Sequence, residues 1–354
     1  MRTALLLGSG LLIAACGSGD DFAPENGSDS ESDTDTDTDV GADAGADAGA
    51  DTDTDSDTDC TYPEVVSDCD GDWCTILPGC FVMGTPEDEL GRDGDETQHQ
   101  VTVSTKFEMG MYEVTENDFI ATTGWWPSSF FMETCTGDCP LTYVSWFDAL
   151  AYANLLSEFD GLTPCYSITV VTCEDDTSVD EDAAACMNEV QGGIDSATVE
   201  LNGVGSPNEC EGYRLPTESE WEYAIRAGSA TAFYKSDGND GTITELLHDP
   251  NMDVIGWYYY NAEFATHAVG GKAANAWGLY DMSGDLWEWV WDWYGAYPQA
   301  PTTDPTGPES ALERVARGGY WASYAQLCRS GNRVSFNPGN RTEVTGFRLA
   351  RSVP

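Results

Sequence analysis

The chain has 354 residues and is strongly acidic, with 14 Lys and Arg against 63 Asp and Glu and a formal net charge of −49. This charge excludes a nucleic-acid binder and electrostatic docking on an anionic membrane surface, because both need clustered basic residues. The three histidines, His99, His248 and His267, are too few for a histidine-rich transition-metal site. The 12 Trp, 16 Tyr and 12 Phe, by contrast, are ample material for a folded core.

Residues 1–16 have the pattern of a lipoprotein signal peptide. Arg2 supplies a positive charge, and residues 4–13 form an apolar run that is too short to span a bilayer as a helix. The sequence Ile13-Ala-Ala-Cys16 resembles a bacterial lipobox, in which Cys16 would carry the lipid. The alternative is an ordinary signal peptide with a chance cysteine. We expect an exported protein, attached to the cell envelope through this anchor alone, at the outer membrane or cell surface.

The next segment, residues 17–59, contains 16 Asp and Glu, no Lys or Arg, and Phe22 as its one aromatic residue. Repeats of Asp-Thr and Gly-Ala-Asp-Ala cannot bury enough apolar surface to offset the entropy of the chain. Like charges extend such a segment, so the composition predicts a disordered acidic tether.

Cysteine usage agrees with export. Of 12 cysteines, ten lie between Cys16 and residue 211, and Cys328 follows alone. In an oxidising compartment the ten can form five disulfides and leave Cys328 as the odd thiol. Cys135 and Cys139 are spaced for a local bridge. For the Cys-rich lead-in, residues 60–79, the alternative is a zinc site made from Cys60, Cys69, Cys74 and Cys80.

Two helices are predicted in the remaining chain. Ser145 can cap a run in which Trp146, Ala149, Leu150 and Ala153 recur at helical spacing. Thr217 and Glu220 form a capping box before a second run that Gly228 closes. Short β-rich runs, such as 100–103 and 255–260, lie between Gly, Asn and Asp turns. This balance predicts an α+β fold.

Four tryptophans alternate with other residues at positions 287, 289, 291 and 293. Period two on a strand places all four indoles on one face. Such a face is either part of the core or a platform on which sugars stack, and we favour the core because large aromatic residues at strand spacing are usually buried.

Seven motifs follow one another over residues 80–351. They are Phe81–Gly84, Tyr112–Thr115, Val144–Ala149, Tyr213–Ala224, Trp277–Trp289, Arg314–Gly319 and Gly346–Arg348. In this order they resemble the formylglycine-generating enzyme family, also described as sulfatase-modifying-factor domains, in its broad bacterial branch. The resemblance implies that residues 80–354 form this family's loop-rich α+β fold, which is related to C-type lectins.

The resemblance also implies a chemistry. The family oxidises a cysteine of a target sulfatase to formylglycine with O₂ and a Cu(I) ion held by two thiolates, and soft sulfur ligands suit Cu(I). Its two cysteines lie four and nine residues after Arg-Gly-Gly, which are Ser323 and Cys328 here. Tyr320 and Tyr324 replace the motif's serine and histidine. An alignment anchored on the downstream arginines moves Cys328 past the second position. Either alignment leaves at most one copper thiolate, so we expect the oxidase activity to be absent.

A calcium position of the family maps onto the side chains of Asp281 and Glu288 and the backbone carbonyls of Gly284 and Leu286. Oxygen ligands of this kind suit Ca²⁺, and the ion would have a structural role. The alternative is that Asp281 and Glu288 only accept hydrogen bonds from turn amides.

Three kinds of function remain open: an enzyme related to the formylglycine-generating oxidases, a non-catalytic envelope module that binds a protein or glycan ligand, and a purely structural envelope protein. A hydrolase using Cys328 and His267 is a weaker alternative, because a lone cysteine is more often structural. The related ergothioneine-type synthases add a histidine-bearing helical bundle, for which no counterpart is visible in this sequence.

Overall fold

The computed structural model describes residues 60, 62–63, 66–127, 135, 138–179, 182–188, 190–236 and 238–353. These residues all fall within Ser56–Pro354, one of the two units into which the chain divides. The predicted signal peptide, Cys16 and the acidic tether lie outside the described residues. Within the described ranges, no helix has both the length and the apolar composition needed to cross a membrane.

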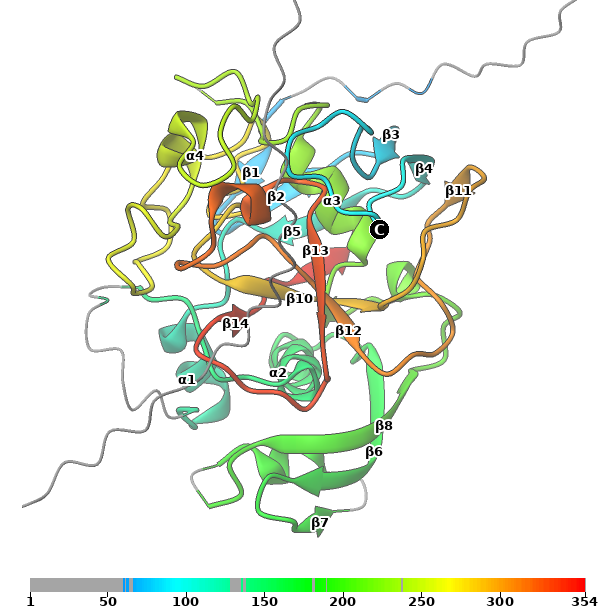
Figure 1. The fold of residues 1–354 in the computed structure, drawn as a ribbon. Coiled ribbons are helices and arrows are strands. Elements are labelled where there is room, and N and C mark those ends of the chain that lie inside the picture. The colour runs from blue at the N-terminus through cyan, green and yellow to red at the C-terminus, as the bar shows by residue number, and fades with distance from the viewer. Residues whose placement is uncertain are drawn as a thin grey trace, which may run out of the picture. The chain divides into compact units, whose positions relative to one another are not determined.

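Four small sheets form the framework of the domain (Figure 1). Their strand orders are β1-β2-β5-β15-β9, β13-β12-β10-β14, β11-β4-β3 and β7-β6-β8. The strands are β1 (Cys69–Asp70), β2 (Trp73–Ile76), β3 (Gly79–Met83), β4 (His99–Val103), β5 (Phe107–Gly110), β6 (Tyr166–Cys173), β7 (Ser178–Val179), β8 (Ile194–Leu201), β9 (Tyr213–Arg214), β10 (Trp287–Trp293), β11 (Thr302–Thr303), β12 (Arg314–Arg317), β13 (Arg333–Phe336), β14 (Thr345–Gly346) and β15 (Ala350–Ser352).

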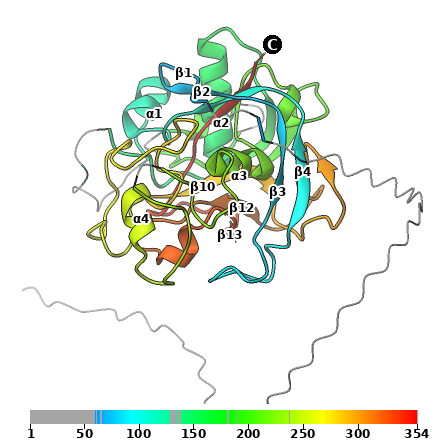
Figure 2. The ribbon, with the colours of Figure 1, turned by 90° about the horizontal axis from the view of Figure 1, so that it is seen from above.

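The α-helices of the described residues are α1 (Glu116–Thr123), α2 (Trp146–Phe159), α3 (Glu218–Arg226) and α4 (Pro250–Ile255). Both predicted helices are confirmed, with their capping boxes: Ser145 with Asp148 before α2, and Thr217 with Glu220 before α3. In Figure 1, α2 lies between the β10–β12 sheet and the arm made by β6, β7 and β8. Figure 2 shows α3 beside the β3–β4 hairpin, and it also contacts β10 and β12.

Two sequence predictions need correction. The chain has more helix than the two predicted elements, because α1 and α4 were missed; α1 is only eight residues long and buries a single side chain, Phe119. The strand predicted at 255–260 is wrong. Asp249 caps α4 and Pro250 occupies its first turn, so Ile255 ends a helix. The Tyr258 carbonyl then accepts from the Asn261 amide at 3.0 Å, which forms a turn.

The tryptophan strand β10 packs into the core. Trp287 and Trp289 are buried, and Trp291 and Trp293 are half-buried. The Trp146 ring at the start of α2 lies 5.5 Å from that of Trp291 and 6.4 Å from that of Trp293. The predicted core face is therefore confirmed, and this strand is no open platform for a sugar.

Ten cysteines are paired and Cys328 is free and buried. The bridges are Cys60–Cys80, Cys69–Cys74, Cys135–Cys139, Cys165–Cys210 and Cys173–Cys186. The zinc alternative is thereby excluded, since all four of its cysteines are in disulfides. The lead-in segment is also built into the domain, because β1 and β2 form the edge of the sheet that contains β5 and β15. The fold is α+β, loop-rich and disulfide-stabilised, as the sequence predicts.

Candidate functional site

The loop after β12 brings the two predicted thiol positions together. Gly318 and Gly319 have φ values of 100° and 87°, which only glycine adopts readily, and they turn the chain sharply. A Cβ on Gly319 would lie 2.6 Å from the Cys328 sulfur, so the close approach of this thiol also requires glycine. The Ser323 hydroxyl accepts from the Tyr320 amide at 3.0 Å and lies within hydrogen-bonding reach of the Cys328 sulfur. A hydroxyl thus stands beside the single thiol.

The Cys328 thiol is held in its neutral form. Its side chain is fully buried, and burial raises the pKa of the thiol far above its usual value despite the Ser323 hydrogen bond and the charge of Arg329. The sulfur donates weakly to the Tyr324 carbonyl. His267 instead stacks on Trp257, with ring centroids 3.8 Å apart, and its Nε2 lies 3.0 Å from the Ala262 carbonyl oxygen. The two residues are not hydrogen-bonded to each other, which disfavours the hydrolase alternative.

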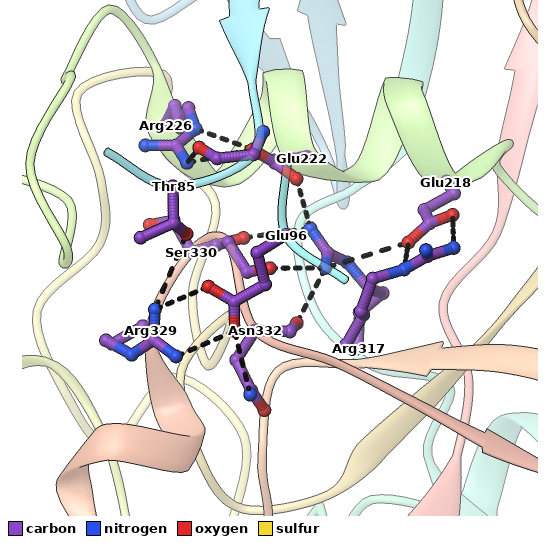
Figure 3. A network of polar contacts seen from close by, with 12 residues as sticks. Thr85, Glu96, Glu218, Glu222, Arg226, Arg317, Arg329, Ser330 and Asn332 are labelled. Atoms are coloured by element: carbon purple, nitrogen blue, oxygen red, sulfur yellow. Dashed lines mark hydrogen bonds and ion pairs between the residues drawn. The ribbon is translucent and has the colours of Figure 1, made fainter. Parts of the chain in front are cut away.

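A buried network of Arg and Glu side chains fixes the chain immediately after Cys328 (Figure 3). Arg317 of β12 pairs with Glu222 of α3 and donates to the carbonyls of Ser330, Gly331 and Asn332. Glu222 also pairs with Arg226 at 2.8 Å. Burial opposes ionisation of Glu222, but the charges of its two arginine partners hold its pKa below the usual value.

The same network continues to the other side of the loop. Arg329 donates to both oxygens of Glu96, each at 2.7 Å, and both residues are fully buried (Figure 3). Paired in this way, the buried charges compensate one another. The network therefore anchors the segment that follows the buried Cys328 to β12, to α3 and to Glu96.

The predicted calcium ligands lie in a second buried cluster. Asp281 Oδ2 accepts from the Gly270 amide at 2.6 Å, while its Oδ1 is buried with no partner among the described residues. Glu288 has no such free oxygen: Arg348 donates to both at 2.6 and 2.7 Å, and the Trp221 indole adds a bond at 2.7 Å. Asp281 therefore has an oxygen free to bind a calcium ion. Glu288 does not, because an ion there would compete with Arg348 for the same carboxylate oxygens.

The electrostatics of this cluster show excess negative charge. Burial raises the pKa of Asp281 to about 6. Burial and the nearby Asp285 raise the pKa of Glu113 well above its usual value, and both Glu113 oxygens lack a partner among the described residues. Within the described ranges, no three His, Cys, Asp or Glu side chains gather closely enough to hold a metal ion. Calcium binding through two carboxylates and two carbonyls stays a prediction.

Next to the Ser323–Cys328 loop are four exposed aromatic side chains, which we call the aromatic surface: Tyr259, Tyr260, Phe264 and Tyr324. Ring centroids are 5.3 Å apart for Tyr259 and Phe264 and 5.1 Å apart for Tyr259 and Tyr324. The Tyr259 amide donates to the Ser323 carbonyl at 2.9 Å, which ties the surface to the loop.

The exposed Phe264 lies on a strained part of the backbone. Glu263 and Phe264 have φ values of 52° and 60°, which bulky residues adopt at a cost. Sequence reasoning missed the aromatic surface, because the tyrosine run 258–260 was assigned to a strand. The available signal was three consecutive tyrosines, which no strand could bury together on one face.

The fold and the Gly-Gly loop define a domain of the formylglycine-generating type. The sequence matches the model of the sulfatase-modifying factor enzyme 1-like domain over residues 63–353, and the chain belongs to this family.

Individual relatives agree with this assignment. The chain is 29% identical to chaperone protein LppX of Paenibacillus barcinonensis over 71% of its length and 82% of that protein. It is 35% identical to the formylglycine-generating enzyme of Thermomonospora curvata, over 39% of this chain and 49% of that one. Among solved structures, Treponema denticola variable protein 1 superposes with a TM-score of 0.64 and 32% identity, covering 79% of this chain and 94% of that protein.

Proposed function

We propose that this chain is an exported lipoprotein whose sulfatase-modifying-factor domain no longer oxidises cysteine and instead binds a ligand. The observation that carries the first part is that Ser323 and the single free thiol Cys328 occupy the two positions after the Gly-Gly turn, so that only one sulfur is present there. A hydroxyl is a poor ligand for Cu(I), which prefers soft sulfur. The residues present therefore do not fit the copper centre that the family resemblance implies.

Restoring the missing thiol tests this directly. Wild-type protein and a Ser323→Cys variant are titrated with Cu(I) against a chromophoric Cu(I) chelator, then incubated with O₂ and a Cys-x-Pro-x-Arg peptide. We expect no copper capture and no change in peptide mass for the wild type, and copper capture by the variant. Conversion of the peptide cysteine to an aldehyde by the wild type would refute the proposal.

The ligand would bind at the aromatic surface. Exposed aromatic rings can stack on the apolar faces of sugar rings, and three of the four residues add phenolic hydroxyls for polar contacts. A glycan of the cell envelope matches this combination, and Tyr324 places part of the aromatic surface on the same loop as Ser323 and Cys328.

A partner protein is the second candidate ligand. Leu246 and Leu247 are also exposed, and their carbonyls accept from the Gln326 and Ala325 amides, so apolar surface extends beside Tyr324. Exposed apolar patches of this kind often mark protein contacts. The relative from Paenibacillus barcinonensis is named a chaperone, which favours the same reading.

Binding is tested on glycan and peptidoglycan arrays with the wild type and with Phe264→Ala and Tyr260→Ala variants. The matched control is Phe159→Ala, because Phe159 is exposed but lies at the end of α2. We expect specific glycan retention that both surface variants lose and the control keeps. Retention that is unchanged in both variants would move the ligand site elsewhere, and absence of any glycan binding would favour the protein partner.

The lipid anchor is a separate proposal, and it rests on Cys16. A Cys16→Ser variant should move from the membrane fraction to the soluble fraction, while the N-terminal peptide of the wild type should carry the mass of the lipid. An unmodified Cys16 in membrane-purified protein would contradict the anchor.

A further inference from the structure

A cavity of about 290 Å³ lies at the end of the tryptophan strand β10, bordered by β4, the start of α3 and the loop of residues 295–308. This volume is at the lower end of the range for ligand pockets, about 300–1,000 Å³, so the cavity suits a small molecule. Its walls are mainly apolar. The apolar side chains that line it are Met83, Trp293, Tyr297, Pro298, Pro305 and Pro308. A ligand for this cavity therefore needs an apolar body.

The Asp292 carboxyl lies in the wall of this cavity and has one oxygen without a partner. The residue is 3% exposed. Its Oδ2 accepts from the Glu218 amide at 2.7 Å, while its Oδ1 accepts no hydrogen bond from the described residues. A Cβ on Gly307, which also lines the cavity, would lie 3.2 Å from this Oδ1, so only glycine leaves the oxygen uncrowded. Buried polar groups are normally satisfied, and the free oxygen points to a ligand that donates to it.

The cations near Asp292 are engaged with other groups. Arg333 donates to both oxygens of Glu218, at 2.8 and 2.7 Å. Arg314 stacks on the Trp293 ring, 3.5 Å from its centroid. Neither arginine forms an ion pair with Asp292 within the described ranges. With histidine neutral, the residues that line the cavity carry two carboxylates against one guanidinium, so a cationic ligand would balance their charge.

The protonation of Asp292 is coupled to this charge balance. Burial raises the pKa of Asp292 well above its usual value, and the charge of Glu218 raises it further, although Arg314 and Arg333 oppose the shift. The other titratable side chains that line the cavity are His99, Glu218, Tyr297 and Arg333. A cation against Oδ1 would favour the ionised carboxylate, so its binding should release a proton.

We propose that this cavity binds a small primary amine with an apolar body, whose ammonium group donates to Asp292 and whose body packs against the aromatic and proline walls. The ammonium group supplies the missing donor and the missing positive charge together. An alcohol of the same shape supplies only the donor, and a metal ion would leave the apolar walls without a role. No residue of the aromatic surface or of the Ser323–Cys328 loop lines the cavity, so this site is separate from the ligand site proposed above.

The test is isothermal titration of the full chain with 2-phenylethylamine. The matched control is 2-phenylethanol, which has the same carbon skeleton and a hydroxyl in place of the ammonium group. We expect the amine to bind at least about tenfold more tightly than the alcohol, a difference of about 1.4 kcal/mol. Titrations at about pH 5 in buffers of different ionisation enthalpy should show proton release with the amine and none with the alcohol.

Variants locate the binding. Asp292→Asn keeps an oxygen for the Glu218 amide and removes the charge, so it should abolish the preference for the amine over the alcohol. Gly307→Ala should weaken the amine severalfold, because its Cβ would lie 3.0 Å from that of Asp292. The matched control is Glu309→Gln, at an exposed carboxylate that does not line the cavity, and it should leave binding unchanged. Circular dichroism and thermal melting establish that each variant is folded; should Asp292→Asn fail to fold, Gly307→Ala decides the matter.

Three results would overturn the proposal: equal affinity for the amine and the alcohol, amine binding that the folded Asp292→Asn and Gly307→Ala variants retain in full, or no binding of either probe. A Tyr260→Ala variant separates this site from the aromatic surface. It should keep amine binding, and loss of amine binding in Tyr260→Ala would place the amine at the aromatic surface and also overturn the proposal.

Discussion

Replacing Asp281 by asparagine tests the electrostatics of the buried acidic cluster. The substitution keeps the side-chain shape and an oxygen that can accept from the Gly270 amide, which now donates to Asp281 Oδ2 at 2.6 Å. It removes a carboxyl group, and burial raises the pKa of that group from 3.8 to about 6. The raised pKa means that the folded state binds this proton more tightly than the unfolded state does.

The sign of the effect on stability follows from this linkage. Asp281 contributes fully to stability below its unfolded pKa of 3.8, and this contribution is lost as the pH rises through the folded value of about 6. One pKa unit corresponds to 1.36 kcal/mol, so the complete shift is equivalent to about 3 kcal/mol. Asparagine is neutral throughout. The variant should therefore gain about 3 kcal/mol over the wild type between about pH 4 and pH 7.

Urea denaturation in the presence of EDTA measures this difference at each pH. EDTA is needed because a cation bound to the wild type would neutralise the carboxylate and mask its cost. The control is Asp240→Asn, at an exposed carboxylate outside the cluster whose pKa is lowered by its hydrogen bonds to Thr242. The reasoning would be refuted if the free energies of unfolding of Asp281→Asn and wild type differed by the same amount at every pH.

The remaining predictions concern the ion-pair network, the free thiol and calcium. Arg317→Met leaves Glu222 buried with one partner fewer and should destabilise the fold by about 3–5 kcal/mol in urea denaturation. Arg351→Met removes a partly exposed ion pair with Glu108 and should lower the free energy of unfolding by about 1 kcal/mol or less. If both variants lost the same stability, the role assigned to the buried network would be contradicted. The Cys328 thiol should resist a disulfide reagent in the native protein and react fully in urea, because burial keeps it neutral. Rapid native-state reaction of one thiol would show that it is accessible. Calcium at the predicted site should stabilise the fold, so EDTA should lower the melting temperature and added Ca²⁺ should restore it. An unchanged melting temperature would contradict the calcium prediction.

The elements that sequence analysis predicted correctly depend on local chemistry. The capping boxes Ser145–Asp148 and Thr217–Glu220 close within four residues, so their hydrogen bonds can be anticipated without knowledge of the fold. The same box exists at Thr115 and Asp118, yet α1 was missed because its one buried residue gives no periodic apolar pattern. The strand predicted at 255–260 failed because a local signal was overlooked: Asp249 caps a helix that Pro250 begins, and the hydroxyl of the buried Tyr258 then bonds back to the Asp249 carbonyl and the Asp253 carboxylate.

By itself, the sequence determined the acidic composition, the family motifs, the odd cysteine and the absence of a second thiol at position 323, because each of these depends only on which residue occupies which position. Tertiary structure alone decided which cysteines pair, that Ser323 lies beside the buried Cys328 thiol, and that four exposed aromatic rings gather next to their loop. It also placed Glu113 in a buried acidic cluster, where neither of its oxygens has a hydrogen-bond partner among the described residues. These features join residues far apart in the chain, and their free energies come from burial and from charges that only folding brings together.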